Sequence, residues 1–170
     1  MAEEIKILFL GECDTGKTTL IKKLMGEEFN ENEPPSNNAS YKSKKILVNN
    51  KNYTLNLWDT TGKNPFRVIT KMFYQDSKIV IFVYDMTHID SFEELNYWIK
   101  SVEENLGQDV IKAIIANKSD LFNGADIHDE KGLTLANEYG AKFFVYSAKN
   151  DSKKKLEEFI VELLKEYLKK

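Results

Sequence analysis

The sequence has little cysteine, and this scarcity excludes several classes of protein. Cys13 is the only cysteine among 170 residues, so no disulfide can form within the chain, and such usage is typical of a reducing compartment. No apolar run approaches the roughly 20 residues that span a bilayer. The first residues, Met-Ala-Glu-Glu, lack the features of a signal peptide. We therefore expect a soluble, cytoplasmic protein.

Arginine and net charge are also scarce. The net charge is -3 at pH 7 and the lysines are scattered, so the sequence offers no basic stripe for a nucleic acid. Arg67 is the only arginine. There is no internal repeat, no linker-like tract and no sustained heptad pattern. With 42% hydrophobic residues, we expect one monomeric domain over residues 1–170 with a sizeable core.

A glycine-rich motif is the most informative feature that is present. Residues 11–18, GECDTGKT, match the phosphate-binding pattern G-x-x-x-x-G-K-T, between an apolar strand at residues 5–10 and an amphipathic helix that starts at Lys17. Backbone N–H groups at the start of that helix, together with its dipole, would surround a polyphosphate. Lys17 would reach the terminal phosphates and the Thr18 hydroxyl would bind Mg²⁺. The alternative is an ordinary turn. The loop residues expected at the phosphates are Cys13, Asp14, Thr15, Gly16, Lys17, Thr18 and Thr19.

Strands alternate with helices along the rest of the chain. Apolar runs without period-two alternation indicate strands buried on both faces of a parallel sheet. These runs lie at residues 6–10, 79–84, 111–116 and 142–146, and a hairpin of residues 41–48 and 53–58 is joined by residues 49–52. Helices are expected after a capping box at Ser91-Phe92-Glu93-Glu94, at residues 130–139 before Gly140, and at residues 153–169. This alternation predicts an α/β doubly wound sheet with its ligand at the carboxyl ends of the strands.

Two polar segments follow predicted strands and would complete a nucleotide site. In Asp59-Thr60-Thr61-Gly62, the Asp59 carboxylate could hold the magnesium shell and the Gly62 N–H could reach a terminal phosphate. In Asn117-Lys118-Ser119-Asp120, the Asp120 carboxylate can accept hydrogen bonds from N1–H and the 2-amino group of guanine, which adenine lacks. Each such charge-assisted bond contributes roughly 1.5 to 3 kcal/mol, so Asp120 would select guanine.

A third segment, Ser147-Ala148-Lys149, would cover the other side of the base. The Ala148 N–H could bond the guanine O6, and the methylene stems of Lys118 and Lys149 could lie across the rings. The alternative for these segments is that they merely end strands. The residues expected at the base are Asn117, Lys118, Asp120, Ser147, Ala148 and Lys149.

With these segments the chain resembles the Ras superfamily of small GTPases over nearly its whole length, and the Rab branch most. The similarity is carried by residues 57–62 (LWDTTG), 66–70 (FRVIT) and 83–87 (VYDMT), followed by Ser91-Phe92. The resemblance implies a three-layer P-loop NTPase (G) domain with a mostly parallel six-stranded sheet and one antiparallel edge strand. It also implies binding of GTP or GDP with Mg²⁺, two nucleotide-sensing switch loops at residues 31–40 and 60–74, and a role in vesicle traffic.

The resemblance assigns further residues. Phe29 falls where the family places an aromatic ring against the base, although a core role is the alternative. Ser36 aligns with the switch threonine that binds magnesium in the GTP state, the alternative being an ordinary loop serine. Tyr41, Trp58 and Phe73 match aromatics of the effector surface, unless they simply pack. The implied metal ligands are Thr18, Ser36 and Asp59. The implied partners are effectors that read the switch loops, with exchange and activating factors.

Lys63 departs from the family, which usually has a water-orienting glutamine after the glycine of the second switch. Lysine has three donors and no acceptor, so it cannot accept a hydrogen bond from the attacking water. Loss of one positioned transition-state contact typically lowers a rate by about 10² to 10³. Arg67 belongs to the second switch, so no internal arginine finger is evident. We therefore expect very slow or absent GTP hydrolysis, and we assign no catalytic residue.

Cys13 and Asp14 stand where the family usually has small residues. Either side chain could obstruct a partner's arginine finger, although Asp14 has a simpler explanation, because aspartate tolerates unusual backbone angles. A thiol at Cys13 activated by the helix N-terminus is a second hypothesis. Ser36 lacks the threonine methyl group, so we expect a first switch that orders weakly around GTP.

The last residues carry no cysteine for a prenyl anchor, so we expect membrane contact to be indirect or to depend on a missing extension. Two function classes remain. The first is a slow GTP-hydrolysing switch, which Thr18 and Asp59 support. The second is a pseudo-GTPase interaction module with a structural nucleotide, which Lys63 favours. An ATP-dependent kinase is disfavoured by Asp120 and the shortage of arginine.

Overall fold

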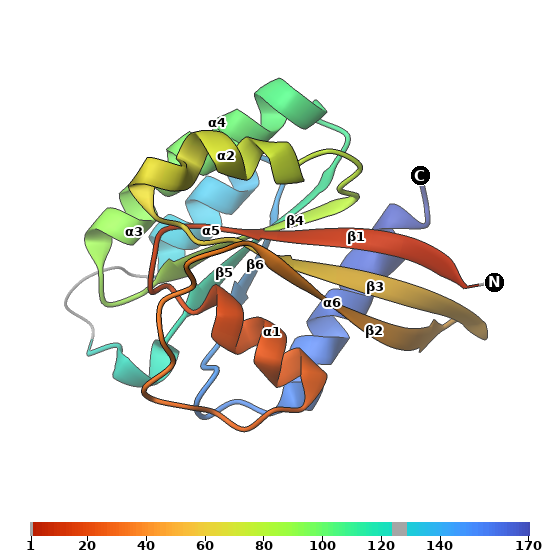
Figure 1. Cartoon of the computed structure of the whole chain (residues 1–170), viewed down its shortest axis with the longest axis horizontal. Coiled ribbons are helices and arrows are strands. Elements are labelled where there is room, and N and C mark those ends of the chain that lie inside the picture. Colours follow the sequence, from red (N-terminus) through yellow and green to blue (C-terminus); the bar gives the residue numbers. More distant parts are fainter. Residues whose placement is uncertain (1, 124–128) are drawn as a thin grey trace.

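The computed structural model describes residues 2–123 and 129–170, and its centre is a six-stranded sheet in the order β2-β3-β1-β4-β5-β6 (Figure 1). The strands are β1 Glu3–Leu10, β2 Ser40–Val48, β3 Lys51–Asp59, β4 Ile79–Asp85, β5 Ile111–Asn117 and β6 Lys142–Val145. β2 pairs with β3 in antiparallel orientation, and all other pairs are parallel. The α/β class and the mostly parallel sheet with one antiparallel edge strand are therefore confirmed.

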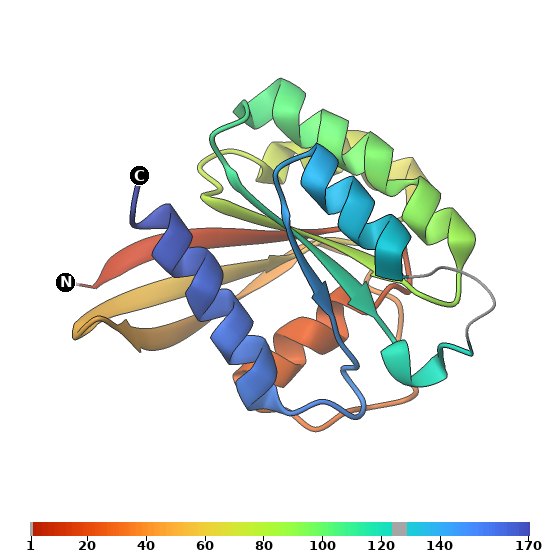
Figure 2. The same ribbon diagram turned by 180° about the vertical axis from the view of Figure 1, so that it is seen from behind.

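Helices cover both faces of the sheet. They are α1 Lys17–Met25, α2 Arg67–Thr70, α3 Ile89–Glu93, α4 Leu95–Leu106, α5 Asp129–Glu138 and α6 Lys153–Tyr167, with short 3₁₀ turns at Asn64–Phe66, Lys71–Phe73 and Ser119–Leu121. Figure 2 shows α1 and α6 on one side of the strands and α4 and α5 on the other. Among the residues described, no helix is long and apolar enough to cross a membrane.

Side-chain alternation along β1 divides the core into two clusters. Ile7 and Phe9 pack with α1 and α6, whereas Leu8 and Leu10 pack with α4 and α5. β4 and β5 are buried along their whole length, which agrees with apolar runs that lack alternation. The carboxyl ends of β1, β3, β4 and β5 consequently meet at one edge, where the polar motifs follow.

The capping box expected at Ser91 is wrong. The helical segment begins earlier, at Ile89, and Ser91 lies inside α3. Its hydroxyl accepts a 3.0 Å hydrogen bond from the Asp85 N–H and donates to the His88 carbonyl at 2.8 Å. The serine therefore fixes the turn after β4, and a tertiary contact replaces the local cap that the pattern suggests.

Three other elements have boundaries that differ from expectation by one or two residues. Asn49 and Asn50 have φ angles of 51° and 61°, so the hairpin closes in a two-residue turn in place of the four-residue connection expected. The last helix begins at Lys153, as expected, after Ser152, whose hydroxyl accepts a hydrogen bond from the Lys155 N–H at 3.3 Å, and it ends at Tyr167, two residues earlier than expected. The expected helix at residues 130–139 lies at Asp129–Glu138, one residue earlier.

Candidate functional site

A cavity of about 400 Å³ lies at the carboxyl ends of the strands. It is bounded by the loop before α1, by the chain between α1 and β2, and by the turns after β3, β5 and β6. This volume is in the range of small-molecule sites. Most sequence-predicted residues line it, namely Asp14, Gly16, Lys17, Thr18, Thr19, Phe29, Ser36, Asn117, Lys118, Asp120, Ala148 and Lys149.

The loop at residues 11–18 has a backbone conformation that requires glycine at position 16. Gly16 has φ 98°, and a Cβ there would lie 2.2 Å from Asn117 Nδ2, so the position excludes side chains. Asp14 also has a positive φ, 62°, which aspartate tolerates, so the simpler explanation of this residue is confirmed. The resulting turn places the start of α1 at the cavity.

Lys17 is a buried cation at the floor of the cavity. Its Nζ donates to the Gly11 carbonyl at 3.0 Å and the Glu12 carbonyl at 2.6 Å. Burial lowers the pKa of Lys17 to about 8, against the opposing effect of the Asp59 carboxylate. The structure gives this ammonium no salt bridge among the residues it describes, so an anion in the cavity would offset its desolvation.

Thr18, Ser36 and Asp59 come together beside this lysine. The Thr18 hydroxyl donates to Asp59 Oδ2 at 2.6 Å and lies 2.5 Å from Ser36 Oγ, which is itself 3.4 Å from Asp59 Oδ2. Burial raises the pKa of Asp59, against hydrogen bonds that lower it, and its Oδ1 is buried without a hydrogen-bond partner.

One carboxylate and two hydroxyls are the hard oxygen ligands that Mg²⁺ prefers, and it commonly takes its remaining ligands from phosphate and water. The orphaned Asp59 Oδ1 fits such an ion. No cluster of three or more His, Cys, Asp or Glu suited to a metal occurs in the part of the chain described. The trio therefore suits a magnesium ion that a polyphosphate helps to hold, rather than an all-protein metal site.

The segments expected to bind the base are joined by side-chain hydrogen bonds. Ser147 Oγ donates to Asp120 Oδ1 at 2.6 Å, which orients the carboxylate expected to face guanine. Buried Asn117 donates to the Thr15 carbonyl at 2.9 Å and accepts from the Ala148 N–H at 3.4 Å. Asn117 thus links the phosphate loop to the turn after β6 and does more than end a strand.

Lys118 and Phe29 flank this region. Lys118 Nζ donates to the Asp14 carbonyl at 2.6 Å and pairs with Asp85 Oδ2 at 2.7 Å, which holds its stem along the cavity. Phe29 is 37% exposed, lines the cavity and belongs to neither core cluster. The alternative of a core role for Phe29 is therefore wrong.

Lys63 connects the two loops named as switches. Its Nζ donates to Asn37 Oδ1 at 2.6 Å. The preceding Gly62 has φ 68°, and a Cβ there would lie 2.4 Å from the Gly11 carbonyl oxygen. Glycine therefore lets the second switch approach the phosphate loop closely, and Lys63 reaches from it to the first switch.

Arg67 points toward the phosphate loop and α4 and does not line the cavity. Its Nη2 lies 2.6 Å from Glu12 Oε1 and 2.9 Å from Glu94 Oε2. The guanidinium stands over the rings of Tyr97 and Trp98, and the Trp98 indole N–H also donates to Glu12 Oε1 at 2.9 Å. Arg67 is thus engaged by two glutamates outside the cavity.

Glu12 was not singled out by the sequence reasoning, because the phosphate-loop pattern leaves this position free. The structure also adds Glu31 and Glu33 to the cavity lining, two acidic residues that no motif marks beside a phosphate site. Only the spacing of the four glutamates in residues 27–33 could have drawn attention to this segment.

Cys13 does not have the environment of an activated thiol. Burial raises its pKa, and the Asp14 carboxylate raises it further, whereas the cations of Lys17 and Lys63 only partly oppose this. The hypothesis that the helix N-terminus activates this thiol is therefore not supported.

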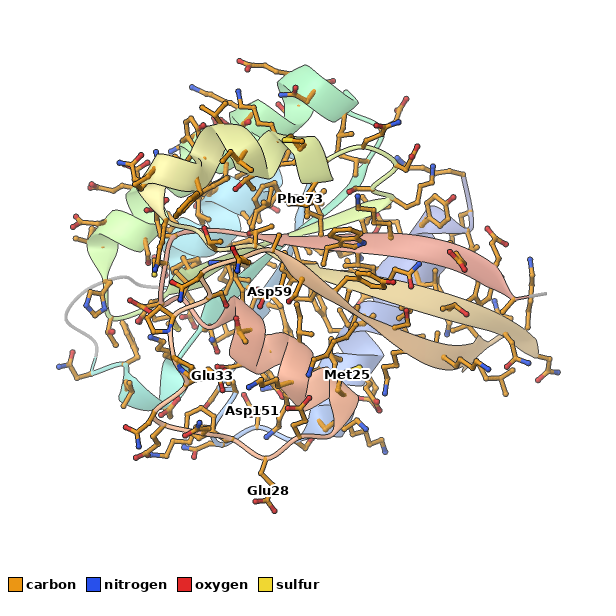
Figure 3. The ribbon with its side chains drawn as sticks, in the orientation of Figure 1. Met25, Glu28, Glu33, Asp59, Phe73 and Asp151 are labelled. Atoms are coloured by element: carbon orange, nitrogen blue, oxygen red, sulfur yellow. The ribbon has the colours of Figure 1, made fainter. Side chains whose placement is uncertain are left out.

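Three aromatic side chains form a continuous surface across β2, β3 and the second switch. The Tyr41 and Trp58 rings stack with centroids 5.1 Å apart, and the Trp58 and Phe73 centroids are 5.6 Å apart. Figure 3 labels Phe73 on the side of the sheet opposite α1. Exposed Val68 and Met72 lie in the same second switch. The arrangement leaves an apolar surface next to both switches.

Known sequences are similar to this chain over most of its length. A sequence model described as Ras family matches residues 6–169. The human Ras-related protein Rab-21 is 33% identical over 164 residues, which are 96% of this chain and 72% of that protein. The human Ras-related protein Rab-8B is 33% identical over 147 residues, which are 86% of this chain and 71% of that protein. The matched range includes all the residues that line the cavity.

Proposed function

This chain belongs to the Ras family, as a Rab-like small GTPase, and from that membership we propose that it is a guanine-nucleotide-binding switch with impaired GTP hydrolysis. Proteins of this family bind GTP and GDP. The observation that carries the proposal is that one cavity is lined both by buried Lys17, at the start of α1, and by Asp120, whose carboxylate accepts a hydrogen bond from Ser147. The buried ammonium suits phosphates and the oriented carboxylate suits a base.

Guanine is the base that this geometry favours. Asp120 accepts hydrogen bonds as a carboxylate, and guanine presents two adjacent N–H donors, whereas adenine presents an acceptor at N1. The Ala148 N–H would donate to the guanine O6 in place of its long 3.4 Å contact with Asn117. Leaving these groups unpaired against adenine would lower its affinity strongly.

At the other end, Lys17, Gly62 and the backbone of residues 13–19 would bind the phosphates. Thr18, Ser36 and Asp59 would hold Mg²⁺, which when bound neutralises charge on the terminal phosphates. Mg²⁺ would give Asp59 Oδ1 the partner that it lacks, and the phosphates would give the buried Lys17 ammonium a counterion. Ligand binding would thus relieve two unfavourable features of the protein alone.

Hydrolysis would be slow because Lys63, the residue after Gly62, cannot accept a hydrogen bond from the attacking water. Lys63 has no lone pair to orient a water molecule, and its ammonium is engaged with Asn37 of the first switch. Arg67 is held by Glu12 and Glu94, outside the cavity. The chain therefore retains the groups that hold GTP and lacks those that usually promote its cleavage.

Partner binding is proposed for the aromatic surface of Tyr41, Trp58 and Phe73, because it borders both switches and Tyr41 is 58% exposed. By similarity to Rab proteins, we place the switch in vesicle traffic, in the cytoplasm and at the periphery of membranes, with effectors, exchange factors and activating factors as partners.

A second candidate is a pseudo-GTPase module whose nucleotide is structural. The observation in its favour is the hydrogen bond from Lys63 to Asn37, which joins the switches through side chains alone. If this bond is present with both GDP and GTP, the switch loops would keep one conformation, and partners could not distinguish the two nucleotide states. Hydrogen exchange of residues 31–40 in the GDP and GTP forms separates the candidates, because only a switch changes its protection.

The decisive experiment is to purify the protein, release its ligand and identify it by chromatography. GTP recovered intact supports impaired hydrolysis, GDP supports a working hydrolase, and no nucleotide overturns the proposal. Titration calorimetry then compares GDP with ADP, for which we expect a preference of at least about 10³-fold for GDP. Asp120→Ala should remove most of this preference, whereas Glu158→Gln, on an exposed helix face, should keep it. Equal affinity for ADP in the unchanged protein would contradict guanine selection.

A further inference from the structure

The chain that connects α1 to β2 contains an acidic segment, residues 27–35, with the sequence EEFNENEPP. It has no helix or strand, and Phe29, Glu31, Glu33 and Pro35 of this segment line the cavity. In Figures 1 and 2 it runs past the loop that follows β6, which carries Lys149. It therefore forms one wall of the site.

Backbone hydrogen bonds do little to hold this wall in place. Along residues 27–39, the described backbone donates two hydrogen bonds to other backbone groups. The Glu27 N–H bonds the Lys22 carbonyl at 2.9 Å, at the end of α1, and the Glu33 N–H bonds the Asn30 carbonyl at 3.3 Å. Beyond its first residue, the backbone of the segment bonds only within the segment. The segment must therefore be attached to the rest of the protein mainly through side chains.

Three ion pairs provide this attachment, and each uses a lysine from a different element. Lys22 of α1 binds both carboxylate oxygens of Glu33, at 2.7 and 2.9 Å. Lys42 of β2 pairs with Glu27, and Lys149, in the turn after β6, pairs with Glu31. We call these three pairs the ionic clasp. It fixes the segment at its beginning, middle and end.

The Lys22–Glu33 pair is the least exposed of the three. The Glu33 side chain is 15% exposed, and the Lys22 side chain 31%. The hydrogen bond to Glu33 raises the pKa of Lys22, and the corresponding bond from Lys42 lowers the pKa of Glu27. Both shifts favour the charged forms, so these side chains carry opposite charges at neutral pH.

We propose that the ionic clasp closes residues 27–35 over the bound nucleotide, so that Glu31 and Glu33 act as positioning residues that slow nucleotide release. This inference rests on the proposed guanine-nucleotide binding, because the nucleotide occupies the cavity that the segment borders. Release requires the wall to move away from the base and ribose, and that movement separates the ion pairs. Its Glu31–Lys149 pair joins the segment to the turn expected to cover the base, which GDP and GTP share, so the clasp slows release of both nucleotides.

Simple electrostatics would lead to the opposite expectation. Glu31 and Glu33 add negative charge beside a polyphosphate, so neutralising them would slow release if repulsion dominated. Under the clasp, neutralising them breaks two attachments of the wall and speeds release. The direction of the change therefore decides between these two roles of the same carboxylates.

The experiment follows the release of a fluorescent GDP analogue into excess unlabelled GDP in the presence of Mg²⁺. Exposed ion pairs contribute modest free energies, so the double variant Glu31→Gln/Glu33→Gln should release the analogue about two- to tenfold faster. Glu28→Gln is the matched control, because Glu28 lies in the same segment, makes no ion pair among the described residues and points away from the body in Figure 3. It should leave the rate unchanged.

A charge swap and a salt series distinguish a clasp from a general loss of structure. Lys22→Glu and Glu33→Lys should each speed release of the analogue. The combined swap restores the ion pair with reversed charges, so its release rate should return at least halfway to that of the unchanged protein. Raising the ionic strength from 0.05 to 0.5 M should speed release more in the unchanged protein than in the double variant, because salt screens exposed pairs. Thermal melting of each variant confirms that it is folded.

The outcomes separate the inference from the function on which it rests. Failure of the unchanged protein to bind labelled GDP overturns the guanine-nucleotide function and the clasp together. Normal binding with unchanged or slower release in the double variant overturns the clasp alone. Normal binding with faster release, rescue by the charge swap and a reduced salt effect supports both.

Discussion

The Arg67 guanidinium lies 2.6 Å from the Glu12 carboxylate, and this ion pair joins the second switch to the phosphate loop. Glu12 also accepts a hydrogen bond from Trp98 of α4, so its carboxylate is bound from two elements. The side chains of Arg67 and Glu12 are 15% and 22% exposed. The only arginine of the chain therefore contributes to holding the fold together. Through Trp98, α4 also contacts the phosphate loop at Glu12.

Arg67→Ala should lower the free energy of unfolding by about 1 to 3 kcal/mol, between the values for exposed and buried pairs, because it leaves Glu12 partly unpaired and uncovers Tyr97. Urea unfolding with saturating GDP measures this change. Lys154→Ala is the control, because its pair with Glu158 is 3.9 Å long and highly exposed. An equal loss in both variants would mean that the bridge is no stronger than an ordinary surface pair.

Cys13 should react slowly with a disulfide reagent at neutral pH. Burial and the Asp14 carboxylate raise the pKa of the thiol, so the thiolate fraction below that pKa is smaller than in free cysteine. The reaction rate should rise about tenfold per pH unit until the raised pKa is passed. Asp14→Asn removes one cause of the shift and should speed the reaction at pH 8, whereas Glu28→Gln should not. Because Cys13 is the only cysteine, the measured rate belongs to one thiol. Equal rates at pH 6 and pH 8 would refute the shift.

The parts of the site that sequence reasoning could place are those in which the backbone dictates the residue type. Gly16 and Gly62 have positive φ and would clash with neighbours if they carried a Cβ. Such positions leave a fixed spacing in the sequence, and the strands before them leave apolar runs. The sheet, and the placement of the glycine-rich loop and of the segments after β5 and β6 at one cavity, were therefore predictable.

The parts that escaped are contacts between charged or polar side chains distant in sequence. Glu12 and Arg67, Lys22 and Glu33, and Lys63 and Asn37 meet only after folding, and none has a local pattern that marks its partner. Ser91 shows the converse case, since its sequence fits a capping box and its hydroxyl bonds Asp85 instead. Local patterns predict local bonds, and a competing tertiary bond is invisible to them.

Asp59→Asn should stabilise the nucleotide-free protein against unfolding and should weaken the effect of Mg²⁺ on GDP affinity. Asp59 Oδ1 is buried without a hydrogen-bond partner, and a neutral amide costs less to bury there than a carboxylate. A gain of about 1 kcal/mol would raise the melting temperature by roughly 2 to 4 °C. The same variant should lose the gain in GDP affinity that Mg²⁺ gives the unchanged protein. Asp109→Asn, at an exposed carboxylate, should change neither quantity. Retention of the magnesium effect in Asp59→Asn would remove Asp59 from the proposed metal ligands.

Lys63→Gln should raise the rate of GTP hydrolysis, by up to about 10²-fold, because an amide oxygen can accept a hydrogen bond from the attacking water. Single-turnover release of phosphate from bound GTP measures this rate. Lys63→Ala is the informative control, since it breaks the bond to Asn37 without supplying an acceptor. If only the glutamine variant is faster, the missing acceptor limits hydrolysis. If both variants are equally fast, the limit is the Lys63–Asn37 bond, which would then obstruct the approach of water by holding the two switches together. If neither is faster, Lys63 does not limit hydrolysis, and Cys13 and Asp14 of the phosphate loop become the next positions to replace.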